Sequence, residues 1–244
     1  MSCDAYRDLW RPFFTLFWRH WPDCPFPVYL GANRLRYDDP RVTTFAAGDY
    51  EWSKRLRLCL EQMDCDYVLL LLEDYFFETS ISNARIIEYL NLLHDLEGSV
   101  LRLYPLPGPD LEIPGQNKIG RIHGMAAYRV STQAAIWSRG TLLRLLRDDE
   151  SIWEFERKGT ERSKHELGAF YATYEAALPY GQVVERGKWF RSAARYYANR
   201  QIGCDFDARP VIGPITALKK AVNRRRKNWA GALWRFRLRG VSWP

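Results

Sequence analysis

The sequence predicts an α/β protein in which a mixed, mostly parallel sheet is flanked by helices. Residues 67–72 form a continuous apolar run, which is typical of a strand buried on both faces at the centre of such a sheet. Segments with strand and helix periodicity alternate along the chain. With 244 residues, 47% hydrophobic and 27% charged, the composition is that of a globular protein and excludes global disorder.

Local patterns predict the elements in chain order. Residues 6–21 place aromatic rings three and four positions apart, which fits a helix with a broad apolar face, and three prolines follow. Ser53 fits an N-cap, so a helix is expected over 53–63. Further helices are expected over 82–96, 133–146, 166–177 and 190–200. Strands are expected over 28–30, 42–45, 67–72, 100–104, 128–130 and 183–184, with a Pro/Gly-rich loop over 105–115.

Charge divides the chain into a mildly acidic body and a basic end. No acidic residue follows Asp207, and ten Lys and Arg residues lie beyond it, so the net charge of +7 leaves a body of about −3. From Ile215 on, apolar residues recur on one helical stripe with basic residues around it, as in interfacial helices. We expect a globular domain over 1–207 and a basic amphipathic extension over 208–244 that binds an anionic membrane surface. The alternative is a helix packed on the domain.

The remaining composition predicts the compartment. Five cysteines form no CxxC pair, which favours reduced thiols, and the apolar runs are too short to span a bilayer. Asp4 and Arg7 lie where a signal peptide would be apolar. We therefore expect a cytoplasmic protein, peripheral on the inner face of the cytoplasmic membrane. Nucleic-acid binding is not expected, because the acidic body would repel a phosphate backbone.

The candidate chemistry rests on carboxylates, because other motifs are missing from the sequence. No GxGxxG follows a strand, no HExxH occurs, and the four histidines are scattered. Glu73 and Asp74 directly follow the apolar run, and ligands of open α/β sheets bind beyond the carboxyl ends of strands. Such carboxylates face solvent, a basic side chain, or a hard divalent cation.

A second acidic cluster, Trp-Glu-Phe-Glu, occupies residues 153–156. Extended geometry would place its rings on one side and its carboxylates on the other. Indole rings around Glu156 would disfavour its charged form, which suits a general base. The alternatives are a solvated acidic turn beside Arg157 and Lys158, or the Glu156–Lys158 pair of a magnesium-dependent nuclease.

Five segments together carry a family resemblance. They are residues 4–14 (DAYRDLWRPFF), 21–31 (WPDCPFPVYLG), 67–76 (YVLLLLEDYF), 131–137 (STQAAIW) and 153–156 (WEFE). They resemble small bacterial GT-A-type glycosyltransferases of surface-polysaccharide or lipopolysaccharide pathways, and the resemblance extends over roughly residues 2–200. It implies a GT-A-like fold for the domain over 1–207, which would be the catalytic domain.

The resemblance also implies a reaction and residue roles. The chain would transfer a sugar, with inversion, from a nucleotide-sugar donor to a hydroxyl of a growing surface glycan or a lipid-linked acceptor. Glu156 would be the catalytic base. The donor would be bound by Asp4, Glu73, Asp74 and Lys188, with Asp74 also holding Mg²⁺ or Mn²⁺ on the diphosphate. The acceptor would be bound by Gln133, Trp153 and Trp189.

Two features depart from the family pattern. Relatives have an apolar first strand just before the Ser-Cys-Asp element, whereas this sequence reads Met-Ser-Cys-Asp from its first residue. The acidic element is Glu-Asp-Tyr and not a strict DxD. Two other functions stay open: a magnesium-dependent nuclease using Glu156 and Lys158, and a membrane-associated scaffold that has the fold without the activity.

Overall fold

The computed structural model describes residues 1–213, which belong to two compact units. The first unit is Met1–Gln182, and the second begins at Val183 and is described as far as Gly213. The basic extension expected over 208–244 falls, from residue 214 on, outside the described residues, and the division at 207 stays a prediction. In the described part of the chain, no helix is both long and apolar enough to cross a membrane.

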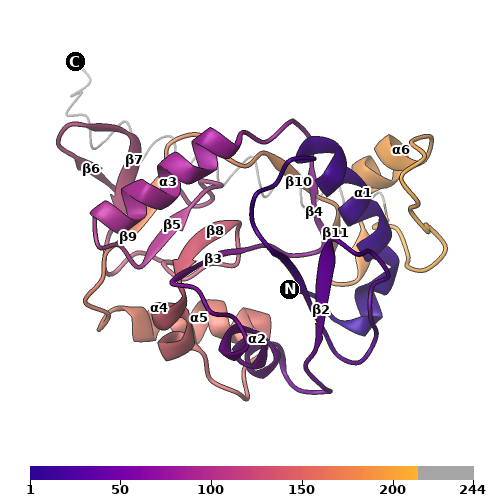
Figure 1. Ribbon diagram of the computed structural model, residues 1–244, viewed down its shortest axis with the longest axis horizontal. Helices are drawn as coiled ribbons and strands as arrows, with labels where there is room; N and C mark the ends of the chain where they lie inside the picture. The colour runs from indigo at the N-terminus through magenta and orange to yellow at the C-terminus, as the bar shows by residue number, and fades with distance from the viewer. Residues whose placement is uncertain (214–244) are drawn as a thin grey trace. The chain divides into compact units, whose positions relative to one another are not determined.

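A six-stranded mixed sheet, in the order β3-β8-β5-β9-β7-β6, lies at the centre of the first unit (Figure 1). Its strands are β3 (Tyr67–Leu70), β5 (Val100–Arg102), β6 (Leu111–Ile113), β7 (Gln116–Ile122), β8 (Ala135–Ser138) and β9 (Phe170–Thr173). Strands β3, β5, β9 and β6 run in one direction and β8 and β7 in the other. The predicted α/β class is confirmed, with most strands of this sheet sharing one direction. Because β8 and β7 are interleaved among them, most hydrogen-bonded neighbours are nevertheless antiparallel.

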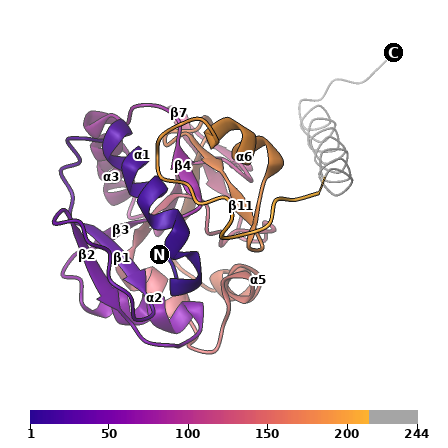
Figure 2. The same ribbon diagram turned by 90° about the vertical axis from the view of Figure 1, so that its right-hand side faces the viewer.

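Two smaller strand pairs complete the first unit. Strands β1 (Val28–Ala32) and β2 (Val42–Ala46) pair in parallel, and helix α2 (Trp52–Glu61) packs against β1 (Figure 2). Strands β4 (Tyr75–Phe77) and β10 (Tyr180–Gln182) pair antiparallel. The β4–β10 pair places Tyr75 opposite Gln182, which brings the residues directly after β3 next to the end of the first unit.

Helices cover both faces of the six-stranded sheet (Figure 1). The helices of the first unit are the 3₁₀ helix η1 (Asp4–Leu9) and the α-helices α1 (Trp10–His20), α2, α3 (Asn83–Asp95), α4 (Arg139–Leu145) and α5 (Ile152–Ser163), and α1 packs on β4. Helix α3 lies on one side of the sheet, and α4 and α5 lie on the other. The predicted aromatic face of α1 is confirmed, since Phe13 and Phe17 are buried and the ring of Phe17 stacks on Phe77 of β4 at 5.4 Å.

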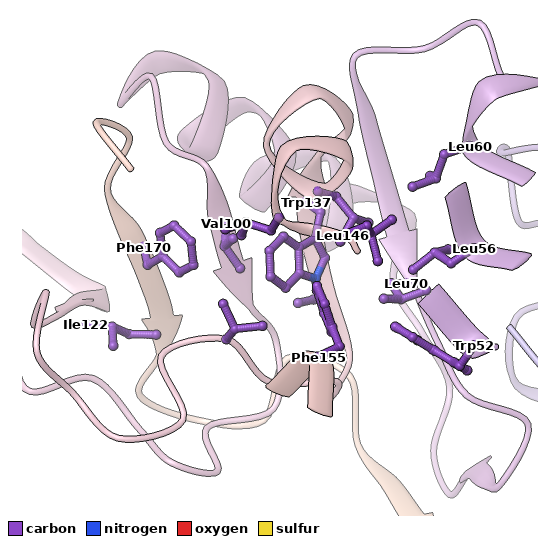
Figure 3. Packing of buried hydrophobic residues seen from close by; sticks show 14 of the residues in the cluster. Trp52, Leu56, Leu60, Leu70, Val100, Ile122, Trp137, Leu146, Phe155 and Phe170 are labelled. Carbon is purple, nitrogen blue, oxygen red and sulfur yellow. The ribbon is translucent and has the colours of Figure 1, made fainter. Parts of the chain in front are cut away.

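The main core lies between the sheet and helices α2, α4 and α5 (Figure 3). Trp137 of β8 is fully buried at its centre, with its ring 6.4 Å from Phe155 of α5 and 6.0 Å from Phe170 of β9. Burying a large apolar side chain contributes about 1.5–3 kcal/mol. This cluster therefore fixes α5 against the sheet, and with it every residue that α5 carries.

Several segments differ from the prediction. Strand β6 lies within the loop expected over 105–115, and α2 has Glu51 as its N-cap, so Ser53 lies inside the helix. The helix expected over 133–146 is strand β8 followed by α4, and the helix expected over 166–177 contains β9. Both strands pair on two sides within the sheet, and this pairing overrides the helix propensity of their alanines. Residues 128–130 form a turn and not a strand, with Tyr128 at a φ of 54°.

The second unit begins with a short hairpin. Strand β11 (Val184–Glu185) pairs with β12 (Lys188–Trp189), and helix α6 (Arg191–Tyr197) follows. Arg186 and Gly187 connect the strands with φ values of 49° and 74°. Two positive φ values match a two-residue type I′ turn, which explains a glycine at the second position.

Candidate functional site

The acidic cluster at 153–156 is helical, so its predicted extended geometry is wrong. Ser151 and Glu154 form a capping box: the Ser151 hydroxyl accepts from the Glu154 N–H, and the Ser151 N–H donates to Glu154 Oε2 at 3.1 Å. This cap starts α5 one residue before Trp153. Phe155 is fully buried, whereas Trp153 is 61% exposed on the surface of the unit. The expected burial of Glu156 among indole rings is therefore not found.

Glu156 is instead held by the segment that leads into β8. Its Oε1 atom accepts from the Thr132 N–H at 2.7 Å, from the Thr132 hydroxyl at 2.8 Å and from the Ser131 hydroxyl at 3.4 Å. All three bonds end on Oε1, and within the described residues no bond is formed by Oε2. The half-buried carboxylate is thus anchored through one oxygen, and its other oxygen can accept a proton.

Two stacked tyrosines lie beside this anchor. The rings of Tyr75 and Tyr180 are 4.2 Å apart, and Tyr104 lies 4.4 Å from Tyr180. The Tyr75 hydroxyl donates to the Thr132 carbonyl at 3.2 Å, and the Tyr180 hydroxyl donates to Gln133 Oε1. Burial raises the pKa of both Tyr75 and Tyr180 well above the ordinary value, so both hydroxyls remain protonated donors at neutral pH.

Asp74 reaches the same cluster from the end of the β3 segment. It is buried, and its Oδ2 atom accepts from Gln182 Nε2 at 3.1 Å. Burial raises the pKa of Tyr75 most, and Tyr180 raises it next. The carboxylates of Asp74 and Glu156 raise it further. Both carboxylates therefore act on one hydroxyl. The structure brings together three of the predicted site residues, Asp74, Gln133 and Glu156.

A buried cation, Arg102, lies within electrostatic reach of Glu156. Its guanidinium donates to three carbonyls, those of Pro107 at 2.6 Å, Tyr128 at 2.8 Å and Arg129 at 3.1 Å. Burial lowers the pKa of Arg102 to about 10, and the Glu156 carboxylate acts in the opposite direction. Arg102 therefore stays charged at neutral pH and favours negative charge nearby.

Asp4 and Glu73 lie apart from this cluster in the contacts they make. The Asp4 carboxylate accepts from the backbone N–H groups of residues 33–35, at 3.0–3.3 Å, and so fixes the loop after β1. Glu73 lines an apolar cavity between β1 and β3, where it acts on the amine of Met1. Their predicted donor-binding roles stay predictions.

Lys188 and Trp189 belong to the second unit. Trp189 is fully buried there, 5.0 Å from the ring of Phe206, and its backbone bonds to Pro210 and Ile212. A buried indole offers no ring surface to an acceptor, so its burial accounts for a tryptophan at this position. Lys188 is exposed on the hairpin.

The acidic residues offer limited means to hold a metal ion. Among residues 1–213, no group of three or more His, Cys, Asp or Glu could hold one together. A Mg²⁺ ion is often bound by one or two carboxylates together with substrate phosphates. Asp74 therefore fits Mg²⁺ or Mn²⁺ only when phosphate oxygens complete the ligand set.

Several residues of the cluster are not predicted by the sequence analysis. Arg102 carried a signal, since it interrupts the apolar strand expected over 100–104. The Ser-x-x-Glu pattern at 151–154 also predicts a helix start at α5. No sequence signal marks Tyr180 and Gln182. They join the cluster through the β4–β10 pairing, which brings together residues more than 100 positions apart.

Comparison with known proteins gives weak likenesses. No protein-family model matches the chain, and no curated protein matches it. Crystal structures of TarS from S. aureus are similar to 73% of the chain: TarS 1-349 (12% identity, TM-score 0.46), TarS (12%, 0.47) and TarS 1-349 in complex with UDP (11%, 0.46). The matched region spans 58% of the TarS 1-349 chains and 35% of the longer one. These values are too low to assign a reaction or a substrate.

Proposed function

We propose that this chain is a glycosyltransferase that moves a sugar from a nucleotide-sugar donor to a hydroxyl of a surface glycan or lipid-linked acceptor. The observation that carries the proposal is the way Glu156 is held. Its Oε1 atom is fixed by the Thr132 N–H and hydroxyl, and Oε2 can accept a proton within a cluster that also contains Asp74 and Gln133. The resemblance of five sequence segments to GT-A-type enzymes points to the same reaction.

Glu156 is the general base in this proposal. Its Oε2 atom takes the proton of the acceptor hydroxyl while that oxygen attacks the anomeric carbon of the donor sugar. The bond from this carbon to the diphosphate oxygen breaks, and the diphosphate leaves with its electron pair. A single displacement of this kind inverts the anomeric centre. Gln133, whose amide oxygen accepts from Tyr180, borders the place where donor and acceptor meet.

Asp74 binds the donor diphosphate in this proposal. A Mg²⁺ or Mn²⁺ ion shared between its carboxylate and the phosphates would neutralise the charge of the leaving diphosphate. Arg102 adds a fixed positive charge within electrostatic reach of Glu156.

The nuclease alternative requires Glu156 and Lys158 to act together. Glu156 and Lys158 are two positions apart on α5, and such positions do not face each other on a helix. Lys158 instead forms ion pairs with Glu154 at 3.1 Å and Glu150 at 4.0 Å. The inactive scaffold is distinguished by experiment, because it would neither cleave a donor nor bind its nucleotide.

Replacing Glu156 tests the base assignment. A panel of UDP-, GDP- and dTDP-sugars is incubated with the full chain, and release of the nucleoside diphosphate is measured. We expect one donor to be cleaved, Glu156→Gln to slow this cleavage at least about 100-fold, and nucleotide affinity to be unchanged. Glu161→Gln, an exposed position on the same helix, is the matched control and should cleave normally. Normal cleavage by Glu156→Gln would contradict the assignment.

A further inference from the structure

Charge is distributed unevenly between the two units of the chain. Residues 1–182 include 21 basic and 26 acidic side chains, whereas residues 183–244 include 15 basic and 3 acidic ones. Part of this positive charge lies on described structure, because five basic residues and no acidic one occur between Glu185 and Asp205. A charge asymmetry of this kind is typical of proteins that bind an anionic surface.

Three of the five charges lie on helix α6 or directly after it (Figure 2). Arg191 and Arg195 are exposed and four positions apart, so they are neighbours on the surface of the helix. Arg200 folds back onto α6, where its Cζ atom lies 3.5 Å from the centre of the Tyr196 ring and its guanidinium donates to the Tyr196 carbonyl. These four residues form what we call the α6 surface.

No acidic side chain neutralises the α6 surface. None of its three arginines forms an ion pair within residues 1–213, and the sequence has no acidic residue after Asp207. In the first unit, by contrast, exposed basic side chains such as Lys118 and Arg144 pair with glutamates. Like charges four positions apart destabilise a helix. An anionic partner would relieve this repulsion on α6.

An aromatic ring lies among the three charges. The Tyr196 side chain is 53% exposed, and its ring packs edge-on against the buried ring of Tyr197 at 4.8 Å. Contacts with Tyr197 and Arg200 therefore hold the ring at the surface of the unit. Tyrosine is enriched where membranes meet water, because its apolar ring and polar hydroxyl suit the headgroup region.

We propose that the α6 surface binds the headgroups of an anionic membrane. Its three guanidinium groups contact lipid phosphates, with which arginine forms charge-assisted, bidentate hydrogen bonds. The Tyr196 ring lies at the level of the headgroups. This contact is separate from the basic extension expected over 208–244, and the two strengthen each other because they belong to one chain. A nucleic acid is a poorer partner, because the excess of acidic residues in 1–182 would repel a phosphate backbone.

Sedimentation of the full chain with lipid vesicles tests the proposal. The vesicles consist of phosphatidylcholine alone or of phosphatidylcholine with phosphatidylglycerol. The α6 variant combines Arg191→Gln, Arg195→Gln and Arg200→Gln. We expect it to bind the anionic vesicles at least about tenfold more weakly than the wild type, because three charges next to an anionic leaflet are lost. Neutral vesicles should bind both proteins weakly and equally.

A matched control removes the same number of charges from the first unit. It combines Arg85→Gln, Arg121→Gln and Arg157→Gln, three exposed positions, and should bind anionic vesicles within about twofold of the wild type. A further variant replaces the three arginines of the α6 surface by lysine, which keeps the charge. It should bind anionic vesicles within about threefold of the wild type.

Four results would overturn the proposal. The first is equal binding of anionic vesicles by the α6 variant and the wild type. The second is an equal loss in the α6 variant and the first-unit control, which would show that only the net charge matters. The third is loss of binding in the lysine variant. The fourth is tighter binding of the wild type to a DNA duplex than to anionic vesicles. None of these measurements depends on the glycosyltransferase activity.

Discussion

At the scale of single residues, Thr132 determines how Glu156 is held. Its N–H and its hydroxyl both donate to Oε1, at 2.7 and 2.8 Å. Thr132→Val keeps the shape and the N–H but removes the hydroxyl, so we expect donor cleavage to slow roughly tenfold as the carboxylate loses its orientation. Nucleotide affinity should not change.

Thr132→Ser is the control for this prediction, since it restores the hydroxyl and should restore cleavage. Kinetics of donor cleavage and calorimetry of nucleotide binding measure both effects. Equal rates for Thr132→Val and Thr132→Ser would show that the hydroxyl has no part in positioning Glu156.

Single site residues could be predicted where the chemistry is carried by one carboxylate or amide next to a recognisable strand. Asp74 is a candidate of this kind, whereas Gln133 is expected only from the family resemblance and Glu156 from an acidic cluster that is helical in the structure. The structure gathers all three around Tyr75 and Tyr180. Trp189 is expected to bind the acceptor, but a tryptophan in a sequence fits a binding surface and a core equally well. Its burial against Phe206 is visible only in the structure.

At the scale of elements, the capping box of α5 makes the stability of the protein depend on pH. The Ser151 N–H and hydroxyl, followed by Lys158, lower the pKa of Glu154 from 4.5 to about 2. A carboxyl whose pKa is lowered in the folded state stabilises it fully above pH 4.5, and this contribution is lost as the pH falls towards 2.

Glu154→Gln therefore should lower the midpoint of thermal unfolding at neutral pH, and its difference from the wild type should shrink between pH 4.5 and 2. Glu161→Gln serves again as the control on the same helix. Calorimetric melts across this range measure the difference, and a gap that is constant with pH would contradict the role of the carboxylate.

Elements could be predicted where local patterning and tertiary contacts agree. The aromatic spacing of α1 and the apolar run of β3 are local signals that the structure confirms as a helix and a strand. The expected central position of β3, buried on both faces, is wrong, because β3 is an edge strand of the six-stranded sheet and three of its four residues are only partly buried. Strand β8 (Ala-Ile-Trp-Ser) follows Gln-Ala and lies inside a segment expected to be helical, and its state is decided by pairing with β3 and β5, which lie far away along the chain. The period of two over 153–156 was misleading because four residues are too few to outweigh a helix cap.

At the scale of the whole molecule, the basic end of the chain predicts membrane binding. Residues 224–227 are Arg-Arg-Arg-Lys, outside the described residues, and each such charge near an anionic leaflet contributes about 1 kcal/mol. We expect the full chain to pellet with anionic vesicles, and a variant with these four residues replaced by Gln to bind at least about tenfold more weakly. Neutral vesicles are the control, and equal pelleting of the two proteins would contradict the prediction.

The central claim is that Asp74 and Glu156 belong to one site for an activated sugar. Isothermal titration of UDP, GDP and dTDP into the full chain with Mn²⁺ tests it most directly, with Asp74→Asn as the variant and the exposed Asp149→Asn as the control. We predict that one nucleotide binds the wild type and Asp149→Asn equally, and binds Asp74→Asn at least about tenfold more weakly. Equal binding by all three proteins, or binding of no nucleotide to the wild type, would contradict the claim.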